Sequence, residues 1–195
     1  MADLSIADWM AAKSAPAELI AWAVNSATMA DVWVDCPSVW CRWIATREGP
    51  LPEQYRRYFA GWAADQVSAL GLSAASTAVN MAFAYADGYA SAADMAMARR
   101  DALMTARSAT GSLGIATVAA GMACGVDAEF SLNAAIAAVE AARMHAVEAA
   151  IADAVDAGGS VSPADYASVG DDAAEAALDA QAVLLREAFT PSFES

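Results

Sequence analysis

Histidine is nearly absent from this chain, and its scarcity removes most acid–base and metal chemistry. The 195 residues include one histidine, His145. A four-helix di-iron site needs two Glu-x-x-His motifs, and Cys36, Cys41 and His145 lack the local spacing of zinc ligands. We therefore expect no metal site. We predict that His145 is a helix-surface residue paired with a nearby glutamate such as Glu148.

Motifs for nucleophilic catalysis and for phosphate binding are also lacking. The chain contains no G-x-S-x-G sequence, and a Cys–His pair would depend on His145 alone. Gly111-Ser112-Leu113-Gly114 lacks the lysine and the preceding strand of a phosphate loop, so it predicts a helix break. We predict that the protein is not an enzyme and has no catalytic residues and no cofactor. An enzymatic role, the least favoured alternative, would require His145.

Cysteine pairs and export signals are missing as well. The three cysteines, Cys36, Cys41 and Cys124, are odd in number and form no C-x-x-C motif. They are typical of small buried hydrophobic residues in a reducing compartment. The first residues lack the basic and apolar regions of a signal peptide, so we expect a cytoplasmic protein in a host cell.

Long apolar runs of the membrane-spanning kind are not found. Residues 66–86 and 108–126 carry no charged side chain, but they are rich in Ala, Gly, Ser and Thr and poor in large aliphatic residues. We interpret both as helices buried within a soluble bundle, and we expect no membrane partner.

Strand patterns are absent, whereas helix boundaries are frequent. No run of Val, Ile and Thr alternates with polar residues, while Pro52 and Glu53 mark a helix start and Gly71 marks its end. The sequence predicts an all-α protein, a single-domain multi-helix bundle over residues 1–195. The expected helices are about 16–27, 30–35, 39–47, 52–70, 73–89, 92–108, 113–123, 131–157 and 171–189.

Large aromatic residues are confined to one end of the chain. The six tryptophans, all in the first third, are Trp9, Trp22, Trp33, Trp40, Trp43 and Trp62. Aromatics at helical spacing normally face inwards, so we expect an aromatic core in residues 1–71; an exposed anchor for a partner is the alternative. Residues 72–126 should form Ala/Gly-rich buried helices that pack closely, and residues 127–195 should form acidic helices.

Basic residues are outnumbered by 24 acids to 10, which gives a net charge of −14. Because such a protein repels phosphates, we expect no direct nucleic-acid binding and a basic protein partner instead. Residues 127–195 contain 13 acids and 2 bases, Arg143 and Arg186, a net charge of −11. A solvated helix face is the ordinary interpretation of such acids. The candidate partner-binding residues are Asp153, Asp156, Asp171, Asp172, Glu175 and Asp179.

The tryptophan-rich segment carries a family resemblance. An opening Asp8-Trp9, then Trp22, a W-x-x-C-P sequence from Trp33 to Pro37 and a W-x-x-W-I-A sequence from Trp40 to Ala45 resemble a group of uncharacterised Ala-rich helical proteins of phages and bacteria. Some of these are labelled immunity proteins. Here Val39 stands where the usual pattern has an aspartate, and one residue fewer separates Cys-Pro from the next tryptophan. The resemblance implies a binding role and assigns no catalytic residues.

These observations together predict a non-enzymatic protein of a phage or other mobile element. It would bind and inhibit a basic nuclease or nucleic-acid-binding defence complex, as an anti-CRISPR, anti-restriction or toxin-immunity protein does, by placing acidic helices in a cationic groove. The alternative is a structural or assembly protein, such as a helical virion or scaffold component. The sequence leaves the oligomeric state open.

Overall fold

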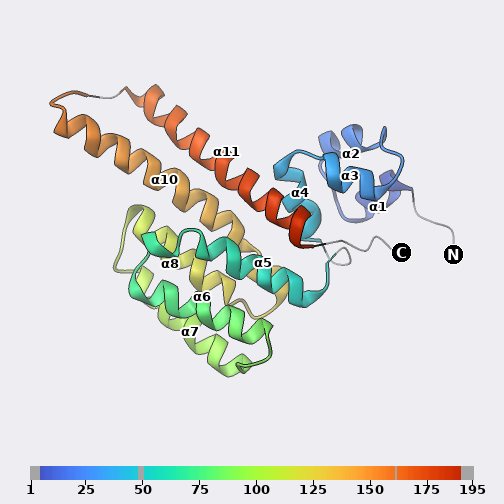
Figure 1. Ribbon diagram of the computed structural model, residues 1–195, viewed down its shortest axis with the longest axis horizontal. Coiled ribbons are helices and arrows are strands. Elements are labelled where there is room, and N and C mark those ends of the chain that lie inside the picture. The colour runs from blue at the N-terminus through green and yellow to red at the C-terminus, as the bar shows by residue number, and fades with distance from the viewer. Residues whose placement is uncertain (1–4, 48–50, 161, 190–195) are drawn as a thin grey trace. The chain divides into compact units, whose positions relative to one another are not determined.

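Alanine-rich segments separated by capping residues form the helices of this protein. The computed structural model describes residues 5–47, 51–160 and 162–189, and within these ranges the chain forms helices and no strand. The all-α prediction is confirmed (Figure 1). The elements are α1 Ile6–Ala12, α2 Ala17–Ala23, α3 Met29–Asp35, α4 Ser38–Ala45, α5 Glu53–Asp65, the 3-10 helix η1 Ser68–Leu70, α6 Ser73–Ala86, α7 Ala92–Ala106, α8 Gly111–Ala123, α9 Ala128–Ser131, α10 Asn133–Asp156 and α11 Pro163–Ala188.

The chain divides into two compact units. Unit 1 comprises Met1–Pro52 with Gln181–Ser195, and unit 2 comprises Glu53–Ala180. Helix α11 is continuous across the second boundary, so its last two turns belong to unit 1. The boundaries fall near residues 52 and 180, not at the composition changes near 71 and 126. The single-domain organisation therefore stays a prediction.

Helix α8 lies at the centre of unit 2. It contacts α5, α6, α7 and α10, and α10 follows it along most of its length. The α8 residues facing these neighbours are almost all small, including Ala116, Ala119, Ala120 and Gly121. Small side chains allow helix axes to approach closely, which confirms the buried, Ala/Gly-rich character expected of this segment.

Two glycines show how tightly the helices of unit 2 approach one another. A Cβ atom placed on Gly61 of α5 would lie 3.0 Å from the ring of Phe83 on α6. One placed on Gly121 of α8 would lie 3.0 Å from the Leu103 side chain of α7. Each large side chain therefore fits against a bare backbone, so the core depends on the complementarity of large and small residues.

Unit 1 contains the aromatic cluster. Trp9 and Trp33 are buried, and the half-buried rings of Trp22 and Trp40 meet edge to face with centroids 5.8 Å apart. The aromatic core expected in this segment is thus present in part. Helix α3 starts with a capping box between Thr28 and its third residue, as a Thr-x-x-Asp sequence favours.

The C-terminal helix starts eight residues before the expected position. Ser162 and Asp165 exchange side-chain-to-backbone hydrogen bonds of 3.3 and 3.2 Å, and Pro163 occupies the first helical position. We had expected the helix to begin after Gly170. That glycine is instead a buried interior position of α11. The described residues include no helix that is both long and apolar enough to cross a membrane.

Candidate functional site

The exposed face of α11 carries most of the acids that the sequence singled out. Asp172, Glu175 and Asp179 recur at intervals of three and four residues, which places them on one side of the helix. All three are exposed. The structure therefore brings these three candidate residues together as one acidic stripe, which we call the α11 acidic face.

The opposite side of α11 is the side that packs. Gly170 lies against α10 so closely that a Cβ there would be 3.0 Å from Val147 and 3.2 Å from the Arg143 side chain. Helical periodicity places Gly170 nearly opposite the α11 acidic face. The acids are thus turned away from α10. In Figure 1 the two helices run antiparallel on either side of the turn at Gly158.

Asp171 forms an ion pair with an arginine of α10. Its carboxylate lies 3.4 Å from Nε of Arg143, and Nη1 of the same arginine lies 3.7 Å from the Glu140 carboxylate. These ion pairs are 43–70% exposed, so solvent screens them and each contributes well under about 1 kcal/mol. Arg143 nevertheless offsets part of the negative charge of Asp171.

The remaining two candidate residues lie elsewhere. Asp153 and Asp156 are exposed near the end of α10. Helical periodicity places them on a side of α10 away from Val147, which with Arg143 meets α11. The six candidate acids therefore do not form one patch. They divide between two sides of the α10–α11 pair.

His145 and Glu148 do not form the pair that we expected. His145 is exposed on α10, whereas the Glu148 carboxylate accepts hydrogen bonds from the Ser112 backbone N–H at 3.1 Å and its hydroxyl at 2.5 Å. Glu148 thereby caps the start of α8, where Thr110 makes no capping side-chain bond within the described residues. The sequence predicted a helix break at Gly111–Gly114, whereas these residues form the first turn of α8, and a carboxylate of the same chain bonds to that turn.

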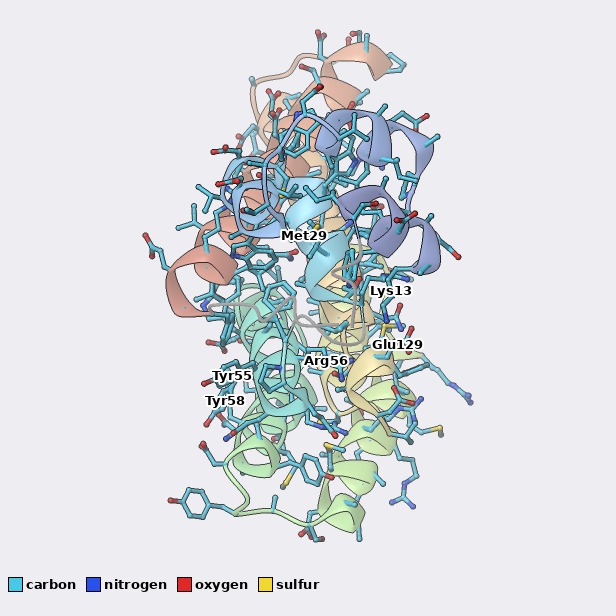
Figure 2. All side chains as sticks on the ribbon, turned by 90° about the vertical axis from the view of Figure 1, so that its right-hand side faces the viewer. Lys13, Met29, Tyr55, Arg56, Tyr58 and Glu129 are labelled. Carbon is cyan, nitrogen blue, oxygen red and sulfur yellow. The ribbon has the colours of Figure 1, made fainter. Side chains whose placement is uncertain are left out.

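Several arginines are held inside unit 2 rather than placed beside the α11 acidic face. Arg57 is 5% exposed, pairs with Glu53 at 2.8 Å, donates to the Gly125 carbonyl at 3.2 Å and lies over the Tyr85 ring. Arg99 stacks on a ring of α9 in the same way. Figure 2 shows Arg56 on the side of α5 turned toward α9. Arg57 and Arg99 therefore stabilise contacts between the helices of unit 2.

Unit 1 contains a group that sequence reasoning missed. Arg186 donates from Nε to the Trp33 carbonyl at 3.2 Å and from Nη2 to the Cys36 carbonyl. The same Nη2 lies 3.9 Å from the Cys36 sulfur, and the interaction between the two thiols lowers the pKa of Cys36 and raises the pKa of Cys41. The sequence signal for this group was the position of two cysteines around Pro37, at the start of a helix.

Two further properties of the chain are its capacity to hold a metal ion and its similarity to known proteins. The described part of the chain contains no group of three or more His, Cys, Asp or Glu side chains that could hold a metal ion. No protein-family model, no curated protein and no solved structure matches the chain.

Proposed function

We propose that this protein is a non-catalytic binding protein that engages a basic partner through the α11 acidic face. The supporting observation is the exposed stripe formed by Asp172, Glu175 and Asp179 on the side of α11 that does not pack against α10. The partner we favour is a nuclease or a nucleic-acid-binding defence complex, because an acidic surface complements the cationic groove of such a protein. An inhibitor of this kind would block the cationic groove that normally receives nucleic acid.

The charge spacing on α11 fits one strand of a nucleic acid better than a duplex. At about 1.5 Å per residue, the three carboxylates span about 10 Å of helix axis. One strand of B-DNA carries about three phosphates over that length, and the duplex carries about six. The α11 acidic face therefore matches a row of basic side chains that contacts a single phosphate backbone. Asp153 and Asp156 would form a separate, peripheral contact.

Charge reversal with a matched control tests this proposal. The variant Asp172→Lys/Glu175→Lys/Asp179→Lys changes the formal charge by six units on the α11 acidic face. The control makes the same change at three exposed acids elsewhere, Glu18, Asp35 and Glu129. Surface ion pairs contribute up to about 1 kcal/mol each, so reversing three should weaken binding by at least about tenfold.

The measurement is affinity capture from bacterial lysate near 0.15 M salt, followed by binding measurements on each purified partner. We expect a basic nucleic-acid-handling protein to be retained by the unmodified protein and the control variant and to be lost from the α11 variant. Equal binding by all three proteins, or equal loss from both variants, would show that α11 is not the contact surface. Net charge alone would then explain any retention.

A structural role through self-association is the second candidate, because aliphatic side chains are exposed along the same helix pair. Val155 is 67% exposed and Ile151 is 40% exposed on α10. These residues would suit a contact between copies of the chain. Sedimentation velocity distinguishes this role: a species whose mass stays that of one chain over a hundredfold range of concentration would remove it.

A further inference from the structure

Two thiols occupy the positions at the start of α4 where a pair of apolar side chains usually meets. Pro37 is the N-cap residue of α4, so Cys36 immediately precedes the cap and Cys41 is the fourth helical residue. Side chains at these two positions normally form a hydrophobic staple. Here both cysteines are buried and reduced, and the Cys36 thiol donates to the Trp33 carbonyl at 3.8 Å. The helix start therefore brings two reactive sulfurs together.

Arg186 makes the two sulfurs chemically unequal. Its guanidinium group holds the carbonyls of Trp33 and Cys36, which fixes Nη2 at 3.9 Å from the Cys36 sulfur. The hydrogen bond from Cys41, together with the positive charge of Arg186, lowers the pKa of Cys36. The same thiol–thiol hydrogen bond and burial raise the pKa of Cys41. Cys36 is thus the more acidic thiol of the pair, and its thiolate, once formed, lies beside the Arg186 guanidinium.

Cys124 in unit 2 provides an internal comparison. It is also buried, but its thiol donates to the Ala78 carbonyl at 3.1 Å, and burial raises its pKa to about 12. At neutral pH it is almost entirely protonated and therefore a poor nucleophile. Burial is common to all three cysteines, and the charges of Arg57 and Arg99 also act on Cys124, whereas the second thiol and the guanidinium–sulfur distance of 3.9 Å are found at Cys36.

We propose that Cys36 and Cys41 are a redox-active pair that forms a reversible disulfide by exchange with a small disulfide oxidant. The Cys36 thiolate attacks one sulfur of the oxidant, which forms a mixed disulfide and releases one thiolate. Cys41 then loses its proton and attacks the Cys36 sulfur, which releases the second thiolate and closes the protein disulfide. Two protein thiols are oxidised, one oxidant disulfide is reduced, and two small thiols leave.

Access to Cys36 follows from the shortness of the neighbouring helices. Helices α3 and α4 contain 7 and 8 residues, and helices of this length are marginal on their own. Local opening of their connection, where Asp35 and Pro37 are already exposed, brings the Cys36 sulfur to solvent without unfolding of unit 2. The closed disulfide would then fix the connection between α3 and α4 covalently.

Oxidised glutathione is the probe, and trypsin separates the cysteines conveniently. Cleavage after Lys13 and Arg42 places Cys36 and Cys41 in one peptide, 14–42, while Cys124 falls in peptide 108–143. After oxidation of the native protein, denaturation and alkylation, we expect peptide 14–42 to have lost two hydrogens and to be unalkylated. Peptide 108–143 should be fully alkylated. Treatment with dithiothreitol before alkylation should restore both thiols.

A conservative variant separates the roles of the two thiols. Cys41→Ser should stop at the first step and accumulate one glutathione on Cys36, because the resolving thiol is missing. In the unmodified native protein, iodoacetamide should label Cys36 at least about tenfold faster than Cys124, since thiolate fraction governs the rate. Equal labelling of the two cysteines, disulfides between chains, or no glutathione on the Cys41→Ser variant would each overturn the proposal.

Discussion

Substitution of Gly111 tests whether the carboxylate of Glu148 holds the start of α8. Gly111 has φ 61°, in the left-handed region, and a Cβ placed there would overlap Oε1 of Glu148. Gly111→Ala therefore imposes two costs, a backbone strain and the displacement of the carboxylate from Ser112. The strain costs about 1 kcal/mol and the loss of a helix cap about 1–2 kcal/mol, so we expect a destabilisation of about 2–3 kcal/mol.

Gly88 separates these two costs because it shares the backbone conformation without the neighbour. Its φ is 79°, and a Cβ there would meet nothing within 4 Å. Gly88→Ala should consequently cost about 1 kcal/mol, the strain alone. Glu148→Ala should cost about 1–2 kcal/mol, because it leaves Ser112 without its acceptor.

The decisive measurement is a double-mutant cycle followed by urea unfolding and far-ultraviolet circular dichroism. In a Glu148→Ala background, Gly111→Ala should cost no more than Gly88→Ala does, since no carboxylate remains to displace. The coupling between the two positions should therefore be about 1–2 kcal/mol. If Gly111→Ala costs the same in both backgrounds, within about 0.5 kcal/mol, the carboxylate does not cap α8 and the reasoning fails.

Three further substitutions follow from the same packing. Arg57→Leu should destabilise unit 2 by about 2–4 kcal/mol in urea unfolding, because the buried Gly125 carbonyl loses its donor. The control, Arg100→Leu at a 72% exposed site, should change the stability by less than about 0.5 kcal/mol. Thr117→Val should cost about 1–2 kcal/mol, since its hydroxyl accepts from the backbone N–H before α6 at 3.0 Å. The hydrogen bonds of the α7 capping box lower the pKa of Asp94, so its stabilisation is complete above about pH 4, the unfolded value, and is lost as pH falls through the folded pKa. The stability difference between the unmodified protein and Asp94→Asn should therefore shrink in urea titrations at pH 3.

The sequence predicted those features that depend on local chemistry. Capping residues and glycines located most helices to within a few residues, and the small residues of α8 indicated its burial. The sequence analysis missed the start of α11 because it took Gly170 as the end of a loop. The structure explains this glycine inside a helix, since a side chain there would crowd Val147 and Arg143. The Ser162-Pro163 start signal was present but outweighed by that glycine.

The candidate site was less predictable because it depends on directions in space. Spacing alone put Asp172, Glu175 and Asp179 on one side of a helix. It could not show that the packed side of α11 lies opposite, or that α10 turns Asp153 elsewhere, because both facts arise from long-range packing. The approach of Arg186 to Cys36 joins residues 150 positions apart, which no local pattern encodes.

Much of the acidity of this protein serves its helices, and this distinction sharpens the case for α11. Several carboxylates bond to backbone N–H groups or cap hydroxyls at helix starts, where the helix dipole favours negative charge. These capping acids are Asp8, Asp31, Asp94, Asp127, Glu148 and Asp165. The α11 acidic face has no such position, because its residues lie in the interior of a 26-residue helix.

The two classes of carboxylate should respond oppositely to substitution. Replacement of a capping acid such as Asp31 by Ala should cost about 1 kcal/mol of stability. The triple lysine variant of the α11 acidic face should fold with nearly unchanged stability, because it removes no cap and lowers the net charge of the chain from −14 to −8. A loss above about 2 kcal/mol in urea unfolding would mean that these acids stabilise α11. Folding would then explain why these acids are present, and their exposure would no longer support a partner-binding role for the α11 acidic face.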